Sequence, residues 1–242
     1  MSVKKKLSFL IDGVTERTVV INSLIIAGWT GRNVEAMEAH ISELEKLGVS
    51  RPTKTPTFYR CAVEQLTMER EFQVIGTDSS GEIEFFILSL DDGYWVGLGS
   101  DHTDRAVEVI DVTVSKQMCA KPIARELWRY DDIIDHWNDL TLKSSIIVDG
   151  KEEKYQEGLV TTMKDPKDLI ALYTGGKKLL PGTLMFCGTL AVSGGVRAAD
   201  IFQASLIDPI LDRKIEFSYQ AIILPSEECL GVIKWDVVNL IW

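Results

Sequence analysis

The stretch GEIEFFILSL, residues 81–90, constrains the fold most, because it places two glutamates at the start of an otherwise apolar run. A run of this kind predicts a buried strand. Side chains alternate between the faces of a strand, so Glu82 and Glu84 share one face, with their Cα atoms about 7 Å apart. Buried carboxylates are rare unless they are paired or bind a metal. The stretch therefore predicts a cation close to both glutamates.

Most of the other segments also predict strands. Asp12–Gly13 and Asp149–Gly150 each mark a turn between two strands. Residues 51–58, with two prolines, predict an extended connection into the sheet. Further strands are expected in the segments SLIIAGW, FQVIG, YWVGLG, AVEVIDVTV, GTLMFCGTL, KIEFSYQAIIL and CLGVIKWDVVNLIW.

A few helices complete the predicted mostly β (α+β) architecture. Apolar residues at helical spacing predict a helix over residues 33–47, ended by Gly48. A short helix is expected over residues 130–140. Asp165, as the cap, and Pro166, at the first helical position, predict the start of a third helix.

Length and composition favour one globular domain. With 242 residues the chain can form one substantial core. We expect a single domain, 1–242, in which residues 1–60 form a strand and helix portion and residues 61–242 form a β-rich core.

Charge, hydropathy and cysteine spacing exclude several classes of protein. The formal net charge of −10 argues against a nucleic-acid surface, which requires clustered basic residues. Behind the N-terminal lysines the apolar segment is broken at Asp12, so we expect neither a signal peptide nor a membrane span. The four cysteines are scattered without a C-x-x-C pair, which favours reduced thiols in the cytoplasm.

A turn after residue 90 would bring a third carboxylate to the two glutamates. If Asp92–Gly93 forms a two-residue type I′ turn, Glu84 lies opposite Asp101 on the same face. A three-residue turn would move Asp101 to the other face. Three carboxylates suit Mg²⁺, Mn²⁺ or Ca²⁺. The alternatives are a solvated acidic strand face or a zinc site through His102, although no second histidine lies nearby.

The helix expected at residues 33–47 carries a candidate general base. His40 falls within its apolar arc, and Glu43 lies on the adjoining edge of the same face. A carboxylate can fix the tautomer of a histidine that titrates near neutral pH, so the pair can activate water. The alternative is a core histidine whose hydrogen bonds are satisfied by its neighbour.

Several motifs together resemble the fumarylacetoacetate hydrolase superfamily, and within it a family known only as a domain of unknown function. The family's opening motif, Gly followed by Tyr-x-x-His-x-x-Glu and a Pro-rich step, is similar to residues 26–58. Its Glu-x-Glu strand is similar to EIE, and its Asn-Asp-x-Ser-x-Arg motif resembles SDHTDR. Its Asn-Gly turn with a following Gln resembles VDGKEEKYQEG, and its last motif resembles LLPGTLMFCGTL. The likeness extends from about Ile25 to Tyr219.

The resemblance implies a role for each matching residue. The implied metal ligands are Glu82, Glu84 and Asp101, and the implied water-activating pair is His40 and Glu43. On the substrate side the matching residues are Lys116 as oxyanion donor, Gln156 and Thr189 as orienting groups, and Arg105 as a structural arginine.

The chain departs from the family pattern in ways that leave two candidates for the lysine of the site. A tight turn replaces the family's helix before Asp101, and only 15 positions separate Asp101 from Lys116, so Lys121 competes for the role. Strand alternation in AVEVIDVTVSK predicts that Lys116 follows Val112 and Val114 inward, while Lys121, before a proline, faces solvent. Leu190 and Cys187 also replace family residues, which affects the choice of substrate.

As a whole, the resemblance implies a rolled mixed β-sheet with peripheral helices, usually as a homodimer. The implied activity is hydrolysis of a C–C bond in a small keto or 1,3-dicarbonyl acid, dependent on Mg²⁺ or Mn²⁺ and passing through an enolate on the metal. Decarboxylation, dehydration and keto-enol isomerisation use the same site. A non-catalytic ligand-binding or assembly protein is a further alternative. The apolar end, residues 229–242, could form a dimer contact or a buried strand.

Overall fold

Residues 3–46 and 51–225 are described by the computed structural model, except for the side chains of residues 40, 43 and 44. The helices are α1 Val34–Lys46, α2 Arg105–Ile110, α3 Val112–Met118 and α4 Pro166–Thr174, and the 3₁₀ turns are η1 Val63–Gln65, η2 Tyr130–Asp132, η3 Ile134–Asp139 and η4 Val160–Thr162. The strands are β1 Lys5–Ile11, β2 Thr15–Ile21, β3 Ser23–Gly28, β4 Thr57–Cys61, β5 Leu66–Thr67, β6 Glu71–Ile75, β7 Ser79–Ser80, β8 Ile83–Leu90, β9 Gly93–Ser100, β10 Thr103–Asp104, β11 Lys121–Pro122, β12 Glu126–Arg129, β13 Thr141–Val148, β14 Lys151–Leu159, β15 Thr183–Thr189, β16 Ile201–Asp208 and β17 Arg213–Leu224.

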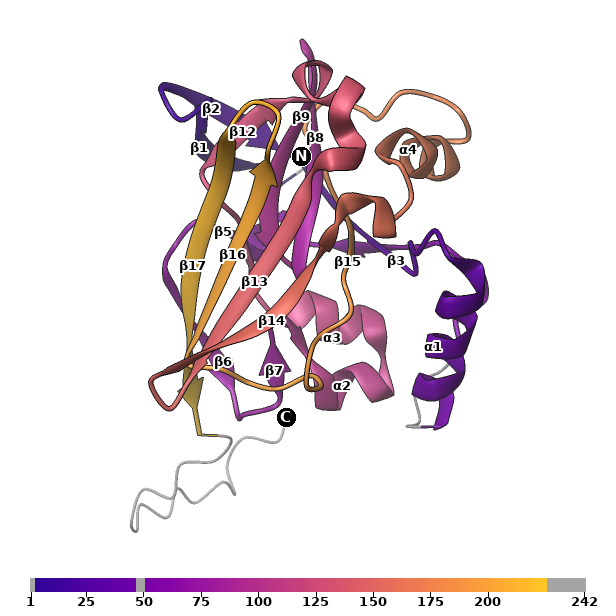
Figure 1. Ribbon diagram of the computed structural model, residues 1–242, viewed down its shortest axis with the longest axis vertical. Helices are drawn as coiled ribbons and strands as arrows, with labels where there is room; N and C mark the ends of the chain where they lie inside the picture. Colours follow the sequence, from indigo (N-terminus) through magenta and orange to yellow (C-terminus); the bar gives the residue numbers. More distant parts are fainter. Residues whose placement is uncertain (1–2, 47–50, 226–242) are drawn as a thin grey trace, which may run out of the picture.

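Two large sheets form the body of the molecule (Figure 1). One has eight strands in the order β2-β1-β12-β9-β8-β15-β3-β4, and the other has five in the order β14-β13-β16-β17-β6. Both are mixed, because β1 pairs in parallel with β12, β15 with β3, and β17 with β6. The predicted mostly β single domain, built on a rolled mixed sheet with peripheral helices, is confirmed.

Strand β8 is buried on both faces. On one face Phe85 and Ile87 pack in a core shared with residues of the five-stranded sheet such as Leu142. On the other face Phe86 and Leu88 belong to a second core. This explains the continuous apolar run in the sequence. Because Glu84 follows the alternation of Phe86 and Leu88, its carboxylate lies at the end of the second core.

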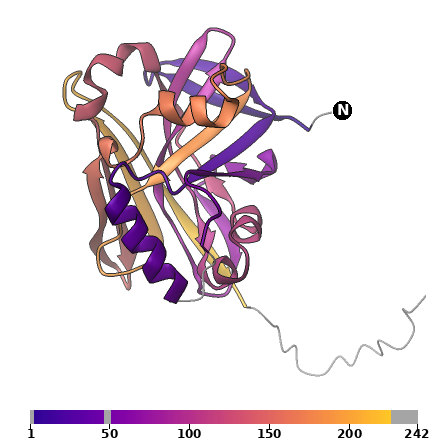
Figure 2. The same cartoon turned by 90° about the vertical axis from the view of Figure 1, so that its right-hand side faces the viewer.

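The helices lie at opposite ends of the molecule: α1, α2 and α3 toward one end and α4 toward the other, as Figure 1 and Figure 2 show. Helix α1 begins at the predicted place, where Oδ1 of Asn33 accepts a hydrogen bond from the backbone N–H of Ala36 at 3.0 Å. Helix α4 begins after Asp165, whose carboxylate caps the N–H of Lys167, and ends at Gly175 with a φ of 66°.

The prediction of a strand over AVEVIDVTV is wrong, because this segment forms α2 and α3. Asp104 caps α2 by accepting from the N–H of Val107, and Asp111 caps α3 by accepting from the N–H of Val114. These two caps outweigh the β propensity of the valines. The short helix expected at residues 130–140 consists of the two 3₁₀ turns η2 and η3.

The strand expected over residues 229–242 lies outside the described residues. Strand β16, which the sequence analysis missed, pairs with β13 and β17 in the middle of the five-stranded sheet. Within the described part of the chain, every helix is too short or too polar to cross a membrane.

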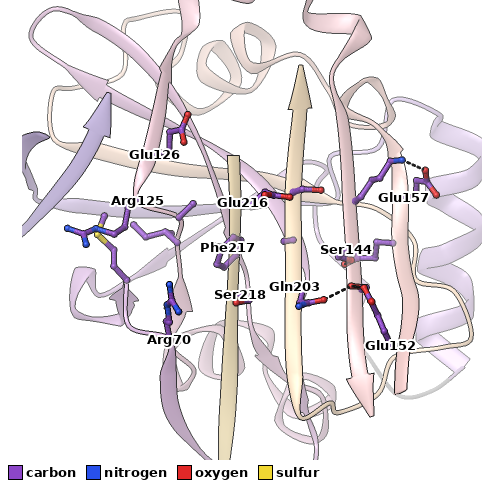
Figure 3. A pocket seen from close by; sticks show the side chains of 18 of the residues that line it. Arg70, Arg125, Glu126, Ser144, Glu152, Glu157, Gln203, Glu216, Phe217 and Ser218 are labelled. Atoms are coloured by element: carbon purple, nitrogen blue, oxygen red, sulfur yellow. Dashed lines mark hydrogen bonds and ion pairs between the residues drawn. The ribbon is translucent and has the colours of Figure 1, made fainter. Parts of the chain in front are cut away.

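The outer face of the five-stranded sheet carries a hollow of about 960 Å³ (Figure 3). Its walls include Arg70 and Arg125 on one side and Glu152 and Glu157 on the other. None of the three carboxylates predicted to bind metal lines this hollow, so its size does not identify it as the reactive site.

Candidate metal centre

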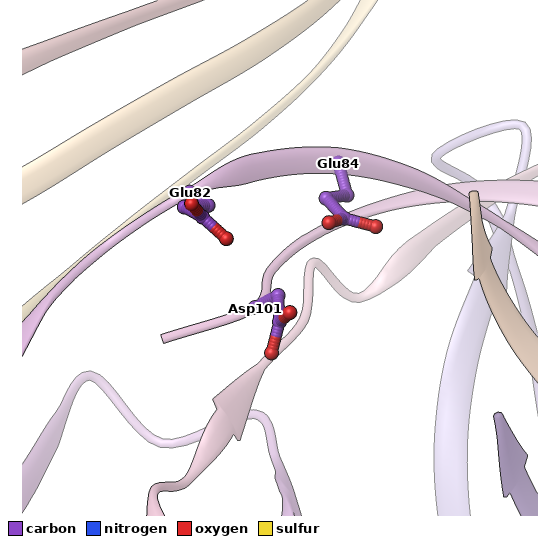
Figure 4. A group of neighbouring side chains, drawn as sticks. All are labelled: Glu82, Glu84 and Asp101. Atoms are coloured by element: carbon purple, nitrogen blue, oxygen red, sulfur yellow. The ribbon is translucent and has the colours of Figure 1, made fainter. Parts of the chain in front are cut away.

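Glu82, Glu84 and Asp101 converge as predicted (Figure 4). One carboxylate oxygen from each residue lies within 4.8 Å of the others. Glu84 and Asp101 are buried, and Glu82 is half-buried. The two glutamates extend from the start of β8, and Asp101 follows the end of β9.

The predicted register of the hairpin is wrong by two residues. Leu90 pairs with Gly93, so the turn residues are Asp91 and Asp92, and the backbone N–H of Asp101 donates to the carbonyl of Glu82 at 3.0 Å. Asp92 is held in the turn by Arg17 and by the indole N–H of Trp95. A shift of two residues keeps every side chain on its face, so the three carboxylates still meet.

A bulge in β15 points a backbone donor at Glu84. The pairing of β15 with β8 shifts between Phe186 and Thr189, and the N–H of Gly188 donates to Oε2 of Glu84 at 2.7 Å. Gly188 has a φ of 101°, and a Cβ atom there would lie 1.8 Å from Oγ1 of Thr30. Only glycine fits this position, which the sequence analysis did not single out.

Two buried lysines bind Asp101. Nζ of Lys116, on α3, donates to Oδ2, and Nζ of Lys121 lies 3.2 Å from Oδ1. Lys121 also donates to the carbonyl of His102 at 2.5 Å. The prediction that Lys121 faces solvent is wrong, because its side chain is 0 % exposed. Lys116 reaches the site as predicted, but from a helix rather than from an alternating strand.

Arg105 holds Glu82 from the other side. Its Nη2 lies 3.1 Å from Oε1 of Glu82, and its Nη1 lies 2.9 Å from Oε2 of Glu108. Its Nε donates to the hydroxyl of Ser80 at 2.8 Å. All of these contacts are with protein side chains, and the structural role that the resemblance implied for Arg105 stays a prediction.

Burial and mutual repulsion set the charge states of the carboxylates. Burial, followed by the charges of Asp101 and Glu82, raises the pKa of Glu84 well above its usual range. Burial also raises the pKa of Glu82, although Arg105 opposes this. Burial would raise the pKa of Asp101 too, but Lys116 and Lys121 outweigh it and lower the value to about 2. The site thus combines an ionised aspartate with glutamates that tend to keep a proton.

This donor set fits a divalent cation. Among the described residues, no hydrogen bond reaches Oε1 of Glu84 or Oε2 of Glu82, and Oδ1 of Asp101 has only the ion-pair contact with Lys121. Hard oxygen ligands of this kind are preferred by Mg²⁺, Mn²⁺ and Ca²⁺. A cation would also replace the protons that burial favours on the glutamates.

Gln156 and Thr189 lie beside the site, but their side chains are already hydrogen-bonded to backbone groups and to each other. Oε1 of Gln156 accepts from the N–H of Ile83 at 3.0 Å, and its Nε2 donates to Oγ1 of Thr189 and to the carbonyl of Leu190. Thr189 in turn donates to the carbonyl of Ile83 at 2.7 Å. Both side chains therefore fix the residue between the two glutamates, and their predicted contact with substrate stays a prediction.

His102 belongs to a separate buried network. Its Nδ1 lies 3.0 Å from the hydroxyl of Tyr219, which lies 2.9 Å from the hydroxyl of Ser100. Burial, reinforced by Lys121 and Arg105, lowers the pKa of His102 to about 3, so the ring is neutral. Ser100 also accepts from the N–H of Glu82 at 3.1 Å. His102 is absent from the group of potential ligands among the described residues, so the zinc alternative gains no support.

The predicted water-activating pair lies on α1. The backbone of His40 and Glu43 is helical as predicted, and their side chains lie outside the described residues. Their position relative to the carboxylates therefore stays a prediction.

Comparison with known proteins agrees with this fold. The family described as Protein of unknown function (DUF2848) matches residues 27–219. The chain belongs to this family. No curated protein sequence matches this DUF2848 chain.

Several solved structures share this fold. A yeast protein, ynq8, described as a fumarylacetoacetate hydrolase family protein, is 16 % identical, with a TM-score of 0.60 over 84 % of this chain and 94 % of that one. Cg1458 with inhibitor is 18 % identical, with a TM-score of 0.62 over 87 % and 80 %. A 2-keto-3-deoxy-D-arabinonate dehydratase complexed with magnesium and 2,5-dioxopentanoate is 14 % identical, with a TM-score of 0.57 over 84 % and 73 %. The fold that the resemblance implied is thus confirmed.

Proposed function

We propose that the protein is a divalent-metal-dependent enzyme that hydrolyses a C–C bond in a small keto or 1,3-dicarbonyl acid, with Mg²⁺ or Mn²⁺ as its cofactor. The observation that carries the proposal is the convergence of Glu82, Glu84 and Asp101 within 4.8 Å in a largely buried site that also holds two lysines. A cation held by these three carboxylates would act as a Lewis acid toward the acid group and the neighbouring carbonyl of the substrate.

The two lysines have different parts in this proposal. Lys121 is fully buried between Asp101 and the carbonyl of His102, so it holds Asp101 in place. Lys116 donates to Asp101, and its Nζ lies 5.7 Å from the centre of the Tyr59 ring. An ammonium has three donors, so Lys116 keeps capacity for a substrate oxygen. It is the residue we expect to stabilise negative charge that develops in the reaction.

The charges around the centre favour an anionic substrate. Glu82, Glu84, Asp101 and Glu108 supply four carboxylates, and Arg105, Lys116 and Lys121 supply three cations. With all of them ionised the group carries one net negative charge, and a divalent ion changes this to one net positive charge. A monocarboxylate would neutralise it.

Dehydration is the second candidate reaction. It is favoured by the shared fold of the dehydratase complexed with magnesium and 2,5-dioxopentanoate. Hydrolysis requires an activated water, for which His40 and Glu43 are the candidates. Dehydration requires only that a proton and a hydroxyl group leave the substrate.

Product analysis separates these reactions. The protein would be incubated with Mg²⁺ or Mn²⁺ and a panel of 2-keto and 1,3-dicarbonyl acids in isotopically labelled water. Hydrolysis gives two products, one of which carries label in a new carboxylate, whereas dehydration gives one product and releases water. For hydrolysis, His40→Ala should slow turnover by about 10² to 10⁴ with metal affinity unchanged. Absence of metal binding and of turnover would favour the non-catalytic alternative.

We also propose a homodimer, as the superfamily resemblance implies. Light scattering on the purified protein, which gives its mass in solution, tests this directly. A monomeric mass would contradict it.

A further inference from the structure

A second hollow, of about 280 Å³, lies between α2 and the segment that leads into β4. Its size is close to the lower end of the range for small-molecule pockets, roughly 300 Å³. The residues that line it are Pro52, Thr53, Thr57, Tyr59, Glu108, Val109, Ile110, Asp111 and Val112.

Two residues that line this hollow contact side chains that hold the carboxylates of the metal centre. The ring of Tyr59 lies 5.7 Å from Nζ of Lys116, which binds Asp101. On the other side, Glu108 pairs with Arg105 at 2.9 Å, and Arg105 lies 3.1 Å from Glu82. The hollow is therefore one residue removed from the carboxylates on two sides, through Lys116 and through Arg105.

The lining is suited to an uncharged group. Apolar surface comes from Pro52, Val109, Ile110, Val112 and the Tyr59 ring, and neutral hydroxyls come from Thr53 and Thr57. No lysine or arginine lines the hollow in the described part of the chain.

Charged groups near the hollow disfavour a second anion. Glu108 and Asp111 both line it. Glu108 is paired with Arg105 at 2.9 Å, and Asp111 has no ion pair in the described part of the chain. Arg51, the nearest arginine in sequence, is engaged by Glu38 at 2.8 Å and by Glu45 at 3.1 Å. Arg51 and Arg105 are therefore both engaged, and an additional carboxylate would meet the unpaired charge of Asp111, which disfavours it.

We infer that this hollow receives the end of the substrate that is remote from the reacting carbonyl, and that it selects a monocarboxylic acid with a short apolar or hydroxylated tail. Glu108 and Asp111 reject a second carboxylate, and Val109 limits the length of the tail. The inference rests on the proposed function, because it places the acid group of the substrate at the metal centre.

Calorimetry in two stages tests the inference apart from the proposed function. Mg²⁺ and Mn²⁺ are first titrated alone, and a failure to bind contradicts the proposed function itself. The Mn²⁺-loaded protein is then titrated with 2-oxopentanoate and with 2-oxoglutarate, which have the same chain length and differ in the terminal carboxylate. We expect the monoacid to bind at least about tenfold more tightly than the diacid.

The double variant Glu108→Gln/Asp111→Asn removes the two charges and keeps similar shapes, and asparagine can still cap α3. It should lower the ratio of the affinity for the monoacid to the affinity for the diacid by about fivefold or more. Asp132→Asn, which changes an exposed acid on η2, is the matched control and should leave the preference unchanged.

A second variant tests the position of the tail without changing charge. Val109→Phe should weaken binding of 2-oxopentanoate by about tenfold and leave the affinity for pyruvate, which has no such tail, unchanged. Val109 is 39 % exposed, so the larger side chain does not overpack the core.

Three results would overturn the inference while the metal site stands. They are equal or tighter binding of 2-oxoglutarate, a preference that the double variant leaves unchanged, and metal binding without binding of either acid.

Discussion

Glu84 is the residue on which the metal centre depends most directly. Its carboxylate is fixed by the N–H of Gly188 and faces Asp101 and Glu82, which raise its pKa in addition to burial. Such a group is held in place without an ion-pair partner among the described residues. This is the arrangement expected of a ligand that is oriented before the ion arrives.

Glu84→Gln should lower the affinity for Mg²⁺ and Mn²⁺ by more than about tenfold, since even the outer partners of metal ligands are worth about 10- to 100-fold. The amide oxygen can still accept from Gly188, so the fold is kept while the charge is lost. Calorimetry measures the affinity, with Asp132→Asn as the control. Unchanged affinity in Glu84→Gln would refute the site.

Replacing Lys116 or Lys121 by methionine should have different effects on the protein. Lys116→Met should lower the turnover number by about 10² or more, the scale of losing one oxyanion donor, with the metal still bound. Lys121→Met should instead lower the free energy of unfolding by about 1–3 kcal/mol, because it leaves the His102 carbonyl and one Asp101 oxygen without their buried donor.

Turnover assays and urea unfolding of both variants distinguish the catalytic role proposed for Lys116 from the structural role proposed for Lys121. If Lys121→Met stays stable but loses turnover while Lys116→Met remains active, the parts assigned to the two lysines are reversed.

At the scale of elements, the site depends on how β8 is joined to β14 and β15. Gln156 on β14 bonds the N–H of Ile83, and Thr189 on β15 bonds its carbonyl, so Ile83 is fixed from two strands. Glu82 and Glu84 flank Ile83 directly. The orientation of both carboxylates thus depends on hydrogen bonds made by residues that are not themselves proposed metal ligands.

Gln156→Met should therefore lower stability by about 1–3 kcal/mol, because it leaves the buried N–H of Ile83 and the carbonyl of Leu190 without these partners. It should also weaken metal binding, although Gln156 is not a ligand. Urea unfolding and calorimetry measure the two effects, and Gln73→Met on the exposed side of β6 is the matched control. A loss of stability without a change in metal affinity would show that Gln156 stabilises the fold but does not position the metal ligands.

Local sequence signals predicted the elements best where a turn or cap residue marked them. Asp149–Gly150 turns between β13 and β14, and Asp165 begins α4, as expected. The helices α2 and α3 were missed because the valines that follow Asp104 and Asp111 have high β propensity. The signal that could have identified them is an aspartate three residues before each capped N–H.

At the scale of the whole molecule, the site joins segments that are far apart in the sequence. Glu84 comes from β8 and Glu82 directly precedes that strand, Lys116 comes from α3, and the N–H of Gly188 comes from β15. Alternation along one hairpin was enough to bring the carboxylates together, because a register error of two residues preserves the face. The burial of Lys121 and the bulge at Gly188 depend on tertiary packing, which local sequence patterns do not predict.

The cluster also makes the stability of the whole molecule depend on pH. The pKa of Glu84 is raised well above 4.5, its ordinary value, so the native state keeps a proton that the unfolded state releases. Stability therefore falls as the pH rises from 4.5 through the native pKa of Glu84. Asp101 acts in the opposite sense in a separate range, because its pKa is lowered from 3.8 to about 2. Its contribution is present above 3.8 and is lost as the pH falls toward 2.

We therefore expect the metal-free protein to lose stability as the pH rises above 4.5 through the native pKa of Glu84, by an amount that Glu84→Gln removes. The comparison with the variant reports on Glu84 together with its coupling to Asp101 and Glu82, because all other titrating groups are present in both proteins. Saturating Mg²⁺ should remove the same loss from the wild type, since a bound ion stabilises the ionised carboxylates. Urea unfolding at several pH values, with and without Mg²⁺, measures both effects. Parallel pH profiles for the wild type and Glu84→Gln would show that Glu84 ionises at its ordinary pH, and that the charges around it are already balanced without an ion.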